Sequence, residues 1–393
     1  MITRVAGKQV AAASSIGYCT NVHAGHGLAG MRESLEKYAV QVREKFAPTQ
    51  MMGVGLWMSA PVAQQLRETD GVAEFRTWLR ENGLKPYTVN GFPYGDFHQP
   101  VVKHEVYKPT WWDRERLDYT CLLADILDEL LEPGEYGSIS TLPLGWPTPE
   151  VGDEQLQIAG EHLRTVARHL AGIEQRTGRL MSVCIEPEPG CLLDEATDMV
   201  EFFQTHLLGS ADDDLVRRHL RICHDVCHSA VMFEPQREAF RLYRDAGIEV
   251  GKMQVSSAVI LDFDRLAGGE REAALEQLAA FHEPRYLHQT TVMREGKRVL
   301  YTDLAEAIAA ERHDLTGCWR THFHVPIFLP CFGYLSTSQS DIREALTAAR
   351  EMSTCEHFEV ETYAWGVLPD ELRRGALADG IADELRWLAA NRG

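Results

Sequence analysis

Acidic side chains stand at the ends of two short apolar, β-prone runs of this sequence. Glu186 ends one run directly before Pro187, and Asp225 ends another run three residues before His228. Proline holds the preceding residue in an extended conformation, which fixes the direction of the Glu186 carboxylate. These residues either supply two carboxylates and an imidazole to one functional site or form acidic turns that cap the following helices.

A second acidic pair, Glu359 and Glu361, lies in the late run Phe358–Thr362. Residues two apart share one face of an extended strand. Two adjacent carboxylates tolerate each other only near a cation or with one of them protonated. The pair therefore indicates a cation site if both side chains face inward; the alternative is that one or both point to solvent.

Two histidines, His322 and His324, have the His-x-His spacing within Arg320–Pro326. On a strand, both imidazoles point the same way and can bind one metal ion, although a paired structural role fits the same spacing. Gln254 ends a further run and offers an oxygen ligand or a hydrogen bond to a substrate hydroxyl. We expect Lys252, two residues earlier, to contact the substrate as well.

Carboxylates and imidazoles on separate strands form an oxygen-rich, nitrogen-assisted site suited to one divalent ion: Mn²⁺, Co²⁺, Zn²⁺ or Mg²⁺. Such an ion polarises a carbonyl, or neighbouring hydroxyl and carbonyl groups, while a glutamate moves a proton. The proton beside a metal-bound carbonyl becomes acidic because the metal stabilises the enediolate charge. This chemistry predicts a polyol or sugar-like small molecule as the substrate.

Two weaker features are a histidine pair and an aromatic block. His23 and His26 follow the first β-prone run and either enter the same site or lie on a loop without a functional role. Tyr94 and His98 belong to the aromatic segment Phe92–His98, which either stacks on a sugar ring or forms a hydrophobic cluster. We expect His23, Tyr94 and His98 to contact the substrate.

The elements that must position these residues alternate between β-prone runs and amphipathic helices. The runs are Ser15–Cys19, Met51–Met58, Lys85–Val89, Tyr136–Leu142, Leu180–Ile185, Leu220–Asp225, Ile248–Val255 and Phe358–Thr362, and the clearest helices are Glu154–Gln175, Glu195–Leu207 and Gln236–Ala246. This alternation predicts right-handed βαβ units and a closed (β/α)8 TIM barrel of the α/β class. The strand ends of a barrel converge on one mouth, so residues far apart in sequence meet there.

We expect one TIM-barrel domain over 1–393 with two insertions. An aromatic loop insertion occupies 91–116, and a long insertion occupies 262–357 and contains a ninth β-like run, Cys318–Ile327. Long loops on the mouth of a barrel form active-site walls or lids. The long insertion is expected to serve as a lid, as a contact in a homodimer, or as both.

The composition excludes several classes of function. Lysine and arginine number 39 against 58 acidic residues, a net charge of −19, whereas nucleic-acid binders and anionic-membrane binders need a basic face. No run of about 18 apolar residues predicts a membrane span, and Met1–Ala13 lacks the apolar centre of a secretory signal. The nine cysteines include no CxxC pair and indicate reduced thiols. We therefore expect a cytoplasmic protein that binds no nucleic acid and does not insert into membranes.

The strand-end acids Glu186, Asp225 and Glu361 resemble the metal-site pattern of the xylose-isomerase-like TIM-barrel superfamily. That superfamily includes sugar isomerases, ketose 3-epimerases and endonuclease-four-type DNA repair enzymes. Four phrases resemble its EboE-type "metabolite traffic protein" family more closely: Tyr18–His23, Asn90–Gly95, His322–Pro326 and Val360–Tyr363. The likeness runs nearly from end to end.

The resemblance implies roles for several residues. Glu186 and Glu361 would both bind the metal and exchange protons with the substrate. Asp225 would be a metal ligand, and His228 a ligand or a substrate contact.

One position departs from the epimerase pattern. The seventh strand of that pattern supplies a histidine ligand, and this chain has Gln254 there. Either the Gln254 side-chain oxygen coordinates the metal, or His324 (with His322 as the other candidate) replaces the missing histidine.

The resemblance also implies a place in metabolism. The EboE family occurs in bacterial gene clusters beside a prenyltransferase-like membrane protein, which makes that membrane protein a candidate partner in making or moving a secondary-metabolite precursor. We expect a metal-dependent isomerase or epimerase of a sugar, a cyclitol or their phosphates. The alternative is a non-catalytic protein that binds a metabolite with its insertions and hands it to the membrane partner. DNA repair shares the fold but conflicts with the negative charge.

Overall fold

The computed structural model describes residues 16–23, 25, 27–69, 71–369, 372 and 375–392. Eight parallel strands form a barrel in the order β1-β14-β7-β6-β5-β4-β3-β2, and a parallel bridge between Cys19 and Gly55 joins its two ends. The strands are β1 (Ile16–Tyr18), β2 (Met52–Trp57), β3 (Leu84–Asn90), β4 (Gly137–Thr141), β5 (Met181–Ile185), β6 (Leu220–Asp225), β7 (Val250–Val255) and β14 (Phe358–Val360). Each predicted run overlaps one of these strands, so the predicted TIM barrel is confirmed.

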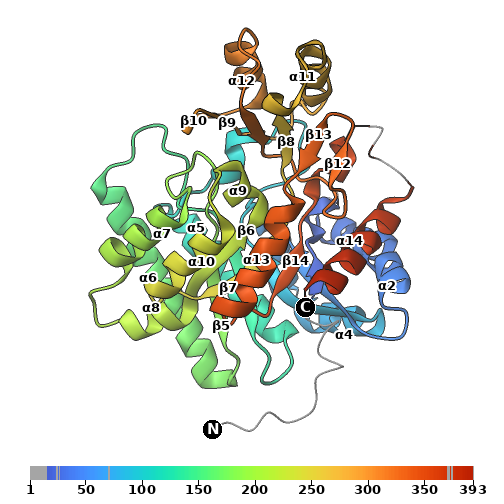
Figure 1. Cartoon of the computed structure of the whole chain (residues 1–393). Helices are drawn as coiled ribbons and strands as arrows, with labels where there is room; N and C mark the ends of the chain where they lie inside the picture. Colours follow the sequence, from blue (N-terminus) through green and yellow to red (C-terminus); the bar gives the residue numbers. More distant parts are fainter. Residues whose placement is uncertain are drawn as a thin grey trace.

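Helices cover the outside of the barrel (Figure 1). They are α1 (Gly27–Ser34), α2 (Val40–Phe46), α3 (Ala60–Glu68), α4 (Gly71–Glu81), α5 (Arg114–Leu130), α6 (Asp153–Thr177), α7 (Ala196–Phe202), α8 (Asp213–His219), α9 (Val226–Val231), α10 (Gln236–Asp245), α13 (Gln339–Met352) and α14 (Leu377–Asn391), with shorter 3-10 and π turns between them. α6 buries Leu163, Val166 and Leu170 at helical spacing and ends at Gly178, whose φ of 72° suits glycine. None of the helices in the described ranges is long and apolar enough to cross a membrane.

Glycines allow the first two strands to approach closely where the barrel closes. A Cβ atom on Gly17 would lie 2.5 Å from the main-chain oxygen of Gly53, and one on Gly53 would lie 2.6 Å from the oxygen of Ile16. Any larger residue at either position would push β1 away from β2.

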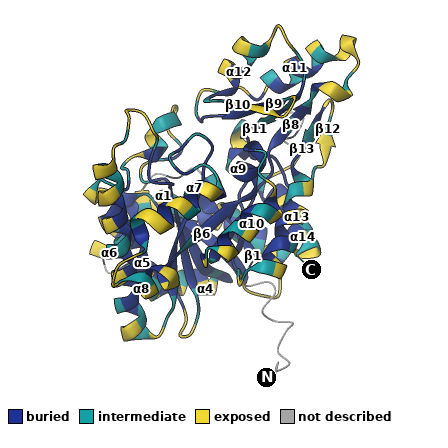
Figure 2. Cartoon of the chain, turned by 60° about the vertical axis from the view of Figure 1, so that its left-hand side comes forward, coloured by how far each residue is buried: buried dark blue, intermediate teal, exposed yellow. Residues whose placement is uncertain are grey.

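A second, antiparallel sheet follows β7 and lies over one end of the barrel (Figures 1 and 2). Its strands are β8 (Val259–Asp262), β9 (Thr290–Arg294), β10 (Lys297–Tyr301), β11 (Cys318–Thr321), β12 (Cys331–Phe332) and β13 (Leu335–Thr337), and α11 (Arg271–Ala279) and α12 (Leu304–Glu311) pack on it. Phe281, Trp319 and Phe323 belong to its own hydrophobic cluster. The observed sheet begins earlier than the insertion expected at 262–357, and α13, inside that range, lies beside α10 on the barrel wall.

The aromatic loop predicted at 91–116 is shorter in the structure because α5 begins at Arg114. Arg116 is buried on the first turn of that helix, and its guanidinium donates to the main-chain oxygens of Gly91 at 2.8 Å and Phe92 at 3.1 Å. A buried guanidinium needs such acceptors. Arg116 thereby fixes the start of the loop to the helix that follows it.

Candidate functional site

Three carboxylates meet at the mouth of the barrel. Glu186 follows β5, Asp225 ends β6, and Glu361 follows β14. The Glu186 main-chain N–H donates to the oxygen of Thr141 at 2.9 Å, so the parallel ladder holds Glu186 one residue beyond its strand. Carboxylate oxygens of the three acids lie within 4.8 Å of one another, and all three residues are buried. The three acids therefore come from three different strands and lie close together at the mouth of the barrel.

The three carboxyl groups of this acidic cluster differ in the direction of their pKa shifts. Burial raises the pKa of Glu186 well above its usual value, and the nearby Asp225 carboxylate raises it further. Burial, Glu186 and Asp225 likewise raise the pKa of Glu361. Burial opposes ionisation of Asp225 too, but His228 and His324 bring its pKa below the usual value. A cation among the three acids would offset this mutual repulsion.

Neighbouring side chains fix the orientation of the acids. Asn21 and Asn90 both donate to Glu361 Oε1, at 2.8 and 2.9 Å. Ser256 donates to Asp225 Oδ1 at 2.7 Å, while Asp225 Oδ2 is buried without a hydrogen-bond partner. Asp225 therefore keeps one oxygen free for a further group.

The two histidines of the His-x-His pair lie just beyond β11, on the segment that joins β11 to β12 of the second sheet. The strand expected over Cys318–Ile327 ends at Thr321, because the pairing partners of β11 in β8 and β9 end there. His322 and His324 nevertheless reach the mouth together, with ring centroids 5.1 Å apart.

The hydrogen bonds of His324 determine which ring nitrogen is free. Nδ1 lies 2.6 Å from the main-chain oxygen of Glu361, which can only accept, so Nδ1 carries the proton. Nε2 has no hydrogen-bond partner and lies 3.9 Å from Asp225 Oδ2. Burial lowers the pKa of His324 to about 4, which keeps the ring neutral. A neutral imidazole with its other nitrogen donating to a carbonyl is the usual state of a metal ligand.

His322 has the same arrangement. Its Nδ1 donates to the side-chain oxygen of Gln289 at 2.8 Å, and its Nε2 is buried without a partner. Burial, together with the neighbouring His228, lowers its pKa well below the usual value. His322 therefore presents a second free imidazole nitrogen.

Gln254, in β7, faces the same mouth. Its Nε2 donates to Glu186 at 3.2 Å, and its Oε1 is buried without a partner. Unpartnered buried polar atoms are rare in folded proteins. Five of them lie around this mouth: Asn21 Oδ1, Asp225 Oδ2, Gln254 Oε1, His322 Nε2 and His324 Nε2. Oxygen and imidazole nitrogen atoms are ligands that a divalent ion takes.

Glu188 joins the site although the sequence did not single it out. Its Oε1 accepts hydrogen bonds from the Tyr107 hydroxyl at 2.7 Å and from Gln289 at 3.1 Å, and its Oε2 lies 3.7 Å from His228 Nε2. Glu188, His228 and His322 form a further set with ligand atoms within 4.8 Å of one another. The signal in the sequence is the repeated Glu-Pro pair, which places Glu188 two residues after Glu186.

His228 differs from the other two histidines of the site. Its Nδ1 donates to the main-chain oxygen of Pro187 at 2.7 Å. Burial opposes its protonation, but the Asp225 and Glu188 carboxylates hold the pKa of His228 above its usual value. His228 is thus the imidazole of the site most ready to carry a proton.

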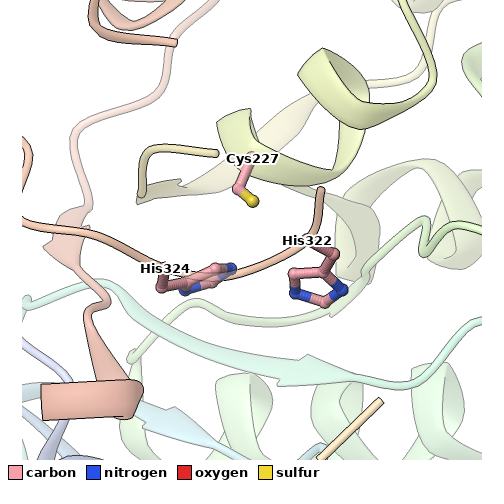
Figure 3. A group of neighbouring side chains, drawn as sticks. All are labelled: Cys227, His322 and His324. Carbon is pink, nitrogen blue, oxygen red and sulfur yellow. The ribbon is translucent and has the colours of Figure 1, made fainter. Parts of the chain in front are cut away.

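A cysteine that the sequence did not single out lies against the His-x-His pair. Cys227, on α9, points toward the rings of His322 and His324 (Figure 3), and the ligand atoms of the three lie within 4.8 Å of one another. Burial raises the pKa of the Cys227 thiol well above its usual value. Without a cation beside it, the sulfur is a protonated, neutral neighbour of the site.

The remaining predicted site residues lie elsewhere. Lys252 is fully buried in the barrel interior, where its Nζ lies 2.6 Å from Glu359 Oε2. His23 and His98 line a neighbouring pocket, and Tyr94 lines a third one. Burial lowers the pKa of His23 to about 3. His26 lies outside the described residues.

A pocket opens above the acidic cluster and holds about 530 Å³ of space, part of it open to solvent. Its walls combine acids and histidines at one end with aromatic and aliphatic side chains at the other. The lining residues are Asn21, Asn90, Phe92, Pro93, Phe97, Val102, Lys103, Val106, Tyr107, Glu186, Glu188, His228, Tyr286, Leu287, His322, His324, Glu361 and Tyr363. A small molecule in this pocket would contact the candidate metal ligands directly.

Glu384, on α14, connects the two segments that bring His324 and Glu361 to the mouth. Its carboxylate accepts hydrogen bonds from the Ile327 main-chain N–H at 3.1 Å and from the Thr362 hydroxyl at 2.6 Å. Burial raises the pKa of Glu384 to about 7. Through Glu384, α14 therefore holds in place the two segments that carry His324 and Glu361.

Comparison with known proteins gives the fold. No protein-family model and no curated protein matches the chain. A xylose isomerase-like TIM barrel protein from Mycobacterium smegmatis in complex with magnesium has a TM-score of 0.51 and 12% identity over 97% of each chain. The probable 3-DHS dehydratase AsbF from Bacillus anthracis has a TM-score of 0.48 and 15% identity over 97% of this chain and 100% of that one. At 12% identity, the likeness to the Mycobacterium smegmatis protein shows a TIM-barrel fold.

Proposed function

We propose that the protein is a metal-dependent isomerase or epimerase of a sugar, cyclitol or related polyol. One divalent ion, Mn²⁺, Co²⁺, Zn²⁺ or Mg²⁺, would be held by Glu186, Asp225, His324 and Glu361. The observation that carries the proposal is the coincidence, at one point of the mouth, of three buried carboxylates with imidazole and carboxylate atoms that lack partners. Buried acids at this spacing are costly without a cation.

A bound divalent ion supplies polarisation of a carbonyl or hydroxyl oxygen of the substrate. The chain supplies the proton-transfer groups. Glu186 and Glu361 both line the pocket, where a carboxylate can exchange a proton with a bound substrate. Asn21 and Asn90 hold Glu361 in one orientation. One glutamate would remove a proton from substrate carbon and the other would return one.

His324 is our choice for the nitrogen ligand. Its Nε2 is free and directed at Asp225, whereas the Gln254 amide nitrogen is engaged by Glu186. Gln254 would orient Glu186 and offer its own oxygen as a weaker ligand. His228 and His322 would contact the substrate, because both line the pocket beside the ligands.

We further propose membership of the EboE-type family and a role in a secondary-metabolite precursor pathway in the cytoplasm, beside a membrane prenyltransferase-like partner. What supports this proposal is the set of four sequence phrases. Residues from all four of them, Asn21, Asn90, His324 and Glu361, meet around the site.

A second candidate function is a metabolite carrier without catalysis. The large apolar share of the pocket lining favours it, since a carrier needs enclosure more than proton-transfer groups. The two functions differ in whether substrate carbon exchanges its proton.

Two measurements test the proposal. Elemental analysis of the purified protein should find about one equivalent of a divalent ion, lost in the Glu186→Ala/Asp225→Ala double variant. Metal-loaded protein in D₂O should then catalyse exchange of a carbon-bound proton in a panel of ketoses and cyclitol ketones, followed by NMR.

Conservative variants separate the two candidate functions. Glu186→Gln and Glu361→Gln, each assayed at a metal concentration that saturates its weakened site, should lower the exchange rate at least about 100-fold. Glu154→Gln, exposed on α6, is the matched control. Metal bound with no exchange on any panel member would favour the carrier, and wild-type exchange in both glutamine variants would refute the proposed roles.

A further inference from the structure

We infer that the substrate of the proposed reaction carries an apolar group, and no phosphate, next to the oxygens that face the metal ligands. This inference rests on the proposed function and names its substrate class. It follows from the walls of the pocket above the acidic cluster, which are apolar and aromatic on one side and acidic on the other.

An unbroken series of aromatic rings leads away from the candidate metal ligands. The Tyr363 ring lies 4.7 Å from the His324 ring, the Tyr286 ring lies 5.1 Å from Tyr363, and the Phe97 ring lies 4.9 Å from Tyr286. All four residues line the pocket. A group bound to the metal-facing oxygens would therefore extend along ring faces and edges.

The polar ends of two wall tyrosines are already engaged. The Tyr286 hydroxyl donates to the main-chain oxygen of Phe97 at 3.2 Å, and the Tyr107 hydroxyl donates to Glu188 at 2.7 Å. Each tyrosine consequently presents carbon to the pocket. Val102, Val106 and Leu287 add aliphatic surface to the same wall. Such a wall gives a polyhydroxylated chain few hydrogen bonds, and burying apolar surface there is favourable.

The charges of the lining disfavour a phosphate group. Glu186, Glu188 and Glu361 are acidic, and of the lining residues that the structure describes only Lys103 carries a permanent positive charge. Lys103 Nζ is paired with Asp303 Oδ2 at 2.6 Å. A phosphate dianion would have to break that pair or rely on one divalent ion against three carboxylates.

The wall is built before any ligand arrives. Main-chain N–H groups of Val102 and Lys103, in the aromatic loop, donate to the oxygen of Arg285 at 2.8 and 3.0 Å. Arg285 precedes Tyr286 on the insertion between β7 and α13, so the loop and the insertion are joined directly at the pocket. A preformed apolar wall spares the ligand the cost of ordering it.

The test uses two metal-chelating probes that differ only in their tail. Acetohydroxamate and octanohydroxamate are titrated into the Co²⁺-loaded full-length protein, and binding is followed by calorimetry and by the visible spectrum of the cobalt. Each methylene buried in an apolar site strengthens binding about fourfold, so octanohydroxamate should bind at least about 100-fold tighter. Inorganic phosphate should fail to displace either probe.

A charged substitution in the wall supplies the control. Val106 is half-buried, so Val106→Asp should fold and remove the advantage of the octyl tail while leaving acetohydroxamate binding unchanged. Val299→Asp, on the exposed strand β10, should leave both affinities unchanged.

The outcomes separate this inference from the proposed function. No change of the cobalt spectrum with either probe would refute the metal centre itself. Equal affinity for the two probes, a tail preference that survives Val106→Asp, or displacement by phosphate would overturn the apolar-substrate inference while leaving the metal centre in place.

Discussion

Lys252 and Glu359 form an ion pair inside the barrel, with Nζ 2.6 Å from Oε2 and neither side chain exposed to solvent. The Glu359 carboxylate shields the lysine charge, so the pKa of Lys252 lies above its usual value even though burial alone would lower it. The pair lies on β7 and β14, two residues before Gln254 and Glu361 respectively, and so forms the layer beneath the candidate site.

Removing one member of this pair should be more damaging than removing both. Lys252→Met leaves a buried carboxylate without a partner, and we expect the free energy of unfolding to fall by about 3–5 kcal/mol. Lys252→Met/Glu359→Gln should recover most of that loss. Urea denaturation of the three proteins measures both changes, and a double variant as unstable as the single one would contradict the pairing.

The choice of His324 as a ligand predicts a ranking of metal affinities. His324→Ala should weaken metal binding at least about 100-fold, because it removes a direct ligand, whereas Gln254→Ala should weaken it about 10-fold by loosening Glu186. Competition with a chromophoric chelator gives both constants. The opposite ranking would make Gln254 the ligand of the seventh strand.

Glu384 predicts a pH dependence of stability. Its pKa in the folded protein is about 7, above the usual value for a glutamate, so the folded state holds a proton that the unfolded state releases at lower pH. Its contribution to stability is complete at acidic pH below the usual glutamate pKa and is lost as the pH rises through about 7, a change of about 3 kcal/mol.

The Glu384→Gln variant cannot release that proton. Its free energy of unfolding should therefore decline less than that of the wild type between about pH 4.5 and pH 8. Glu154→Gln, at an exposed position, should follow the wild-type curve. Parallel curves for wild type and Glu384→Gln would show that this carboxyl group is ionised throughout the range.

Metal removal should lower thermal stability. A ligand that binds only the folded state stabilises it by about 2.7 kcal/mol at 100 times its Kd, which corresponds to a few degrees in Tm for a chain of this size. Chelator-treated wild type should melt at the lower temperature, and added Co²⁺ or Mn²⁺ should restore the higher one. Asp225→Asn should melt at one temperature in both conditions; a metal-dependent rise in this variant would place the ion elsewhere.

Much of the barrel could be predicted from the sequence because its strands are buried on both faces. Such strands read as short apolar runs, and Leu220–Asp225 matches β6 at both ends. The second sheet was harder to recognise because its strands are short and half exposed: β10, Lys297–Tyr301, has no buried residue. Short runs that mix polar and apolar residues give a weak strand signal, so the sequence predicts only Cys318–Ile327 of this sheet, and that run contains a four-residue strand.

The candidate site was predicted where residue type and strand end coincide. Glu186, Asp225 and Glu361 follow from position alone, since strand ends of a barrel share one mouth. Side-chain depth could not be read in the same way. Lys252 lies on the same strand as Gln254, yet it points into the barrel and pairs with Glu359 instead of reaching the pocket. Long-range partners of this kind depend on strand register, which cannot be read from a single sequence.

The hydrogen bonds that Glu384 makes to Ile327 and Thr362 bear on when, during synthesis, the candidate site is completed. During synthesis, residues 186 and 225 leave the ribosome long before 324 and 361, and the helix that braces the last two is made later still. An ion that arrives before residue 324 has been made meets at most two of its four proposed ligands. Capture of the proposed ion would therefore follow the synthesis of residue 361 and of α14.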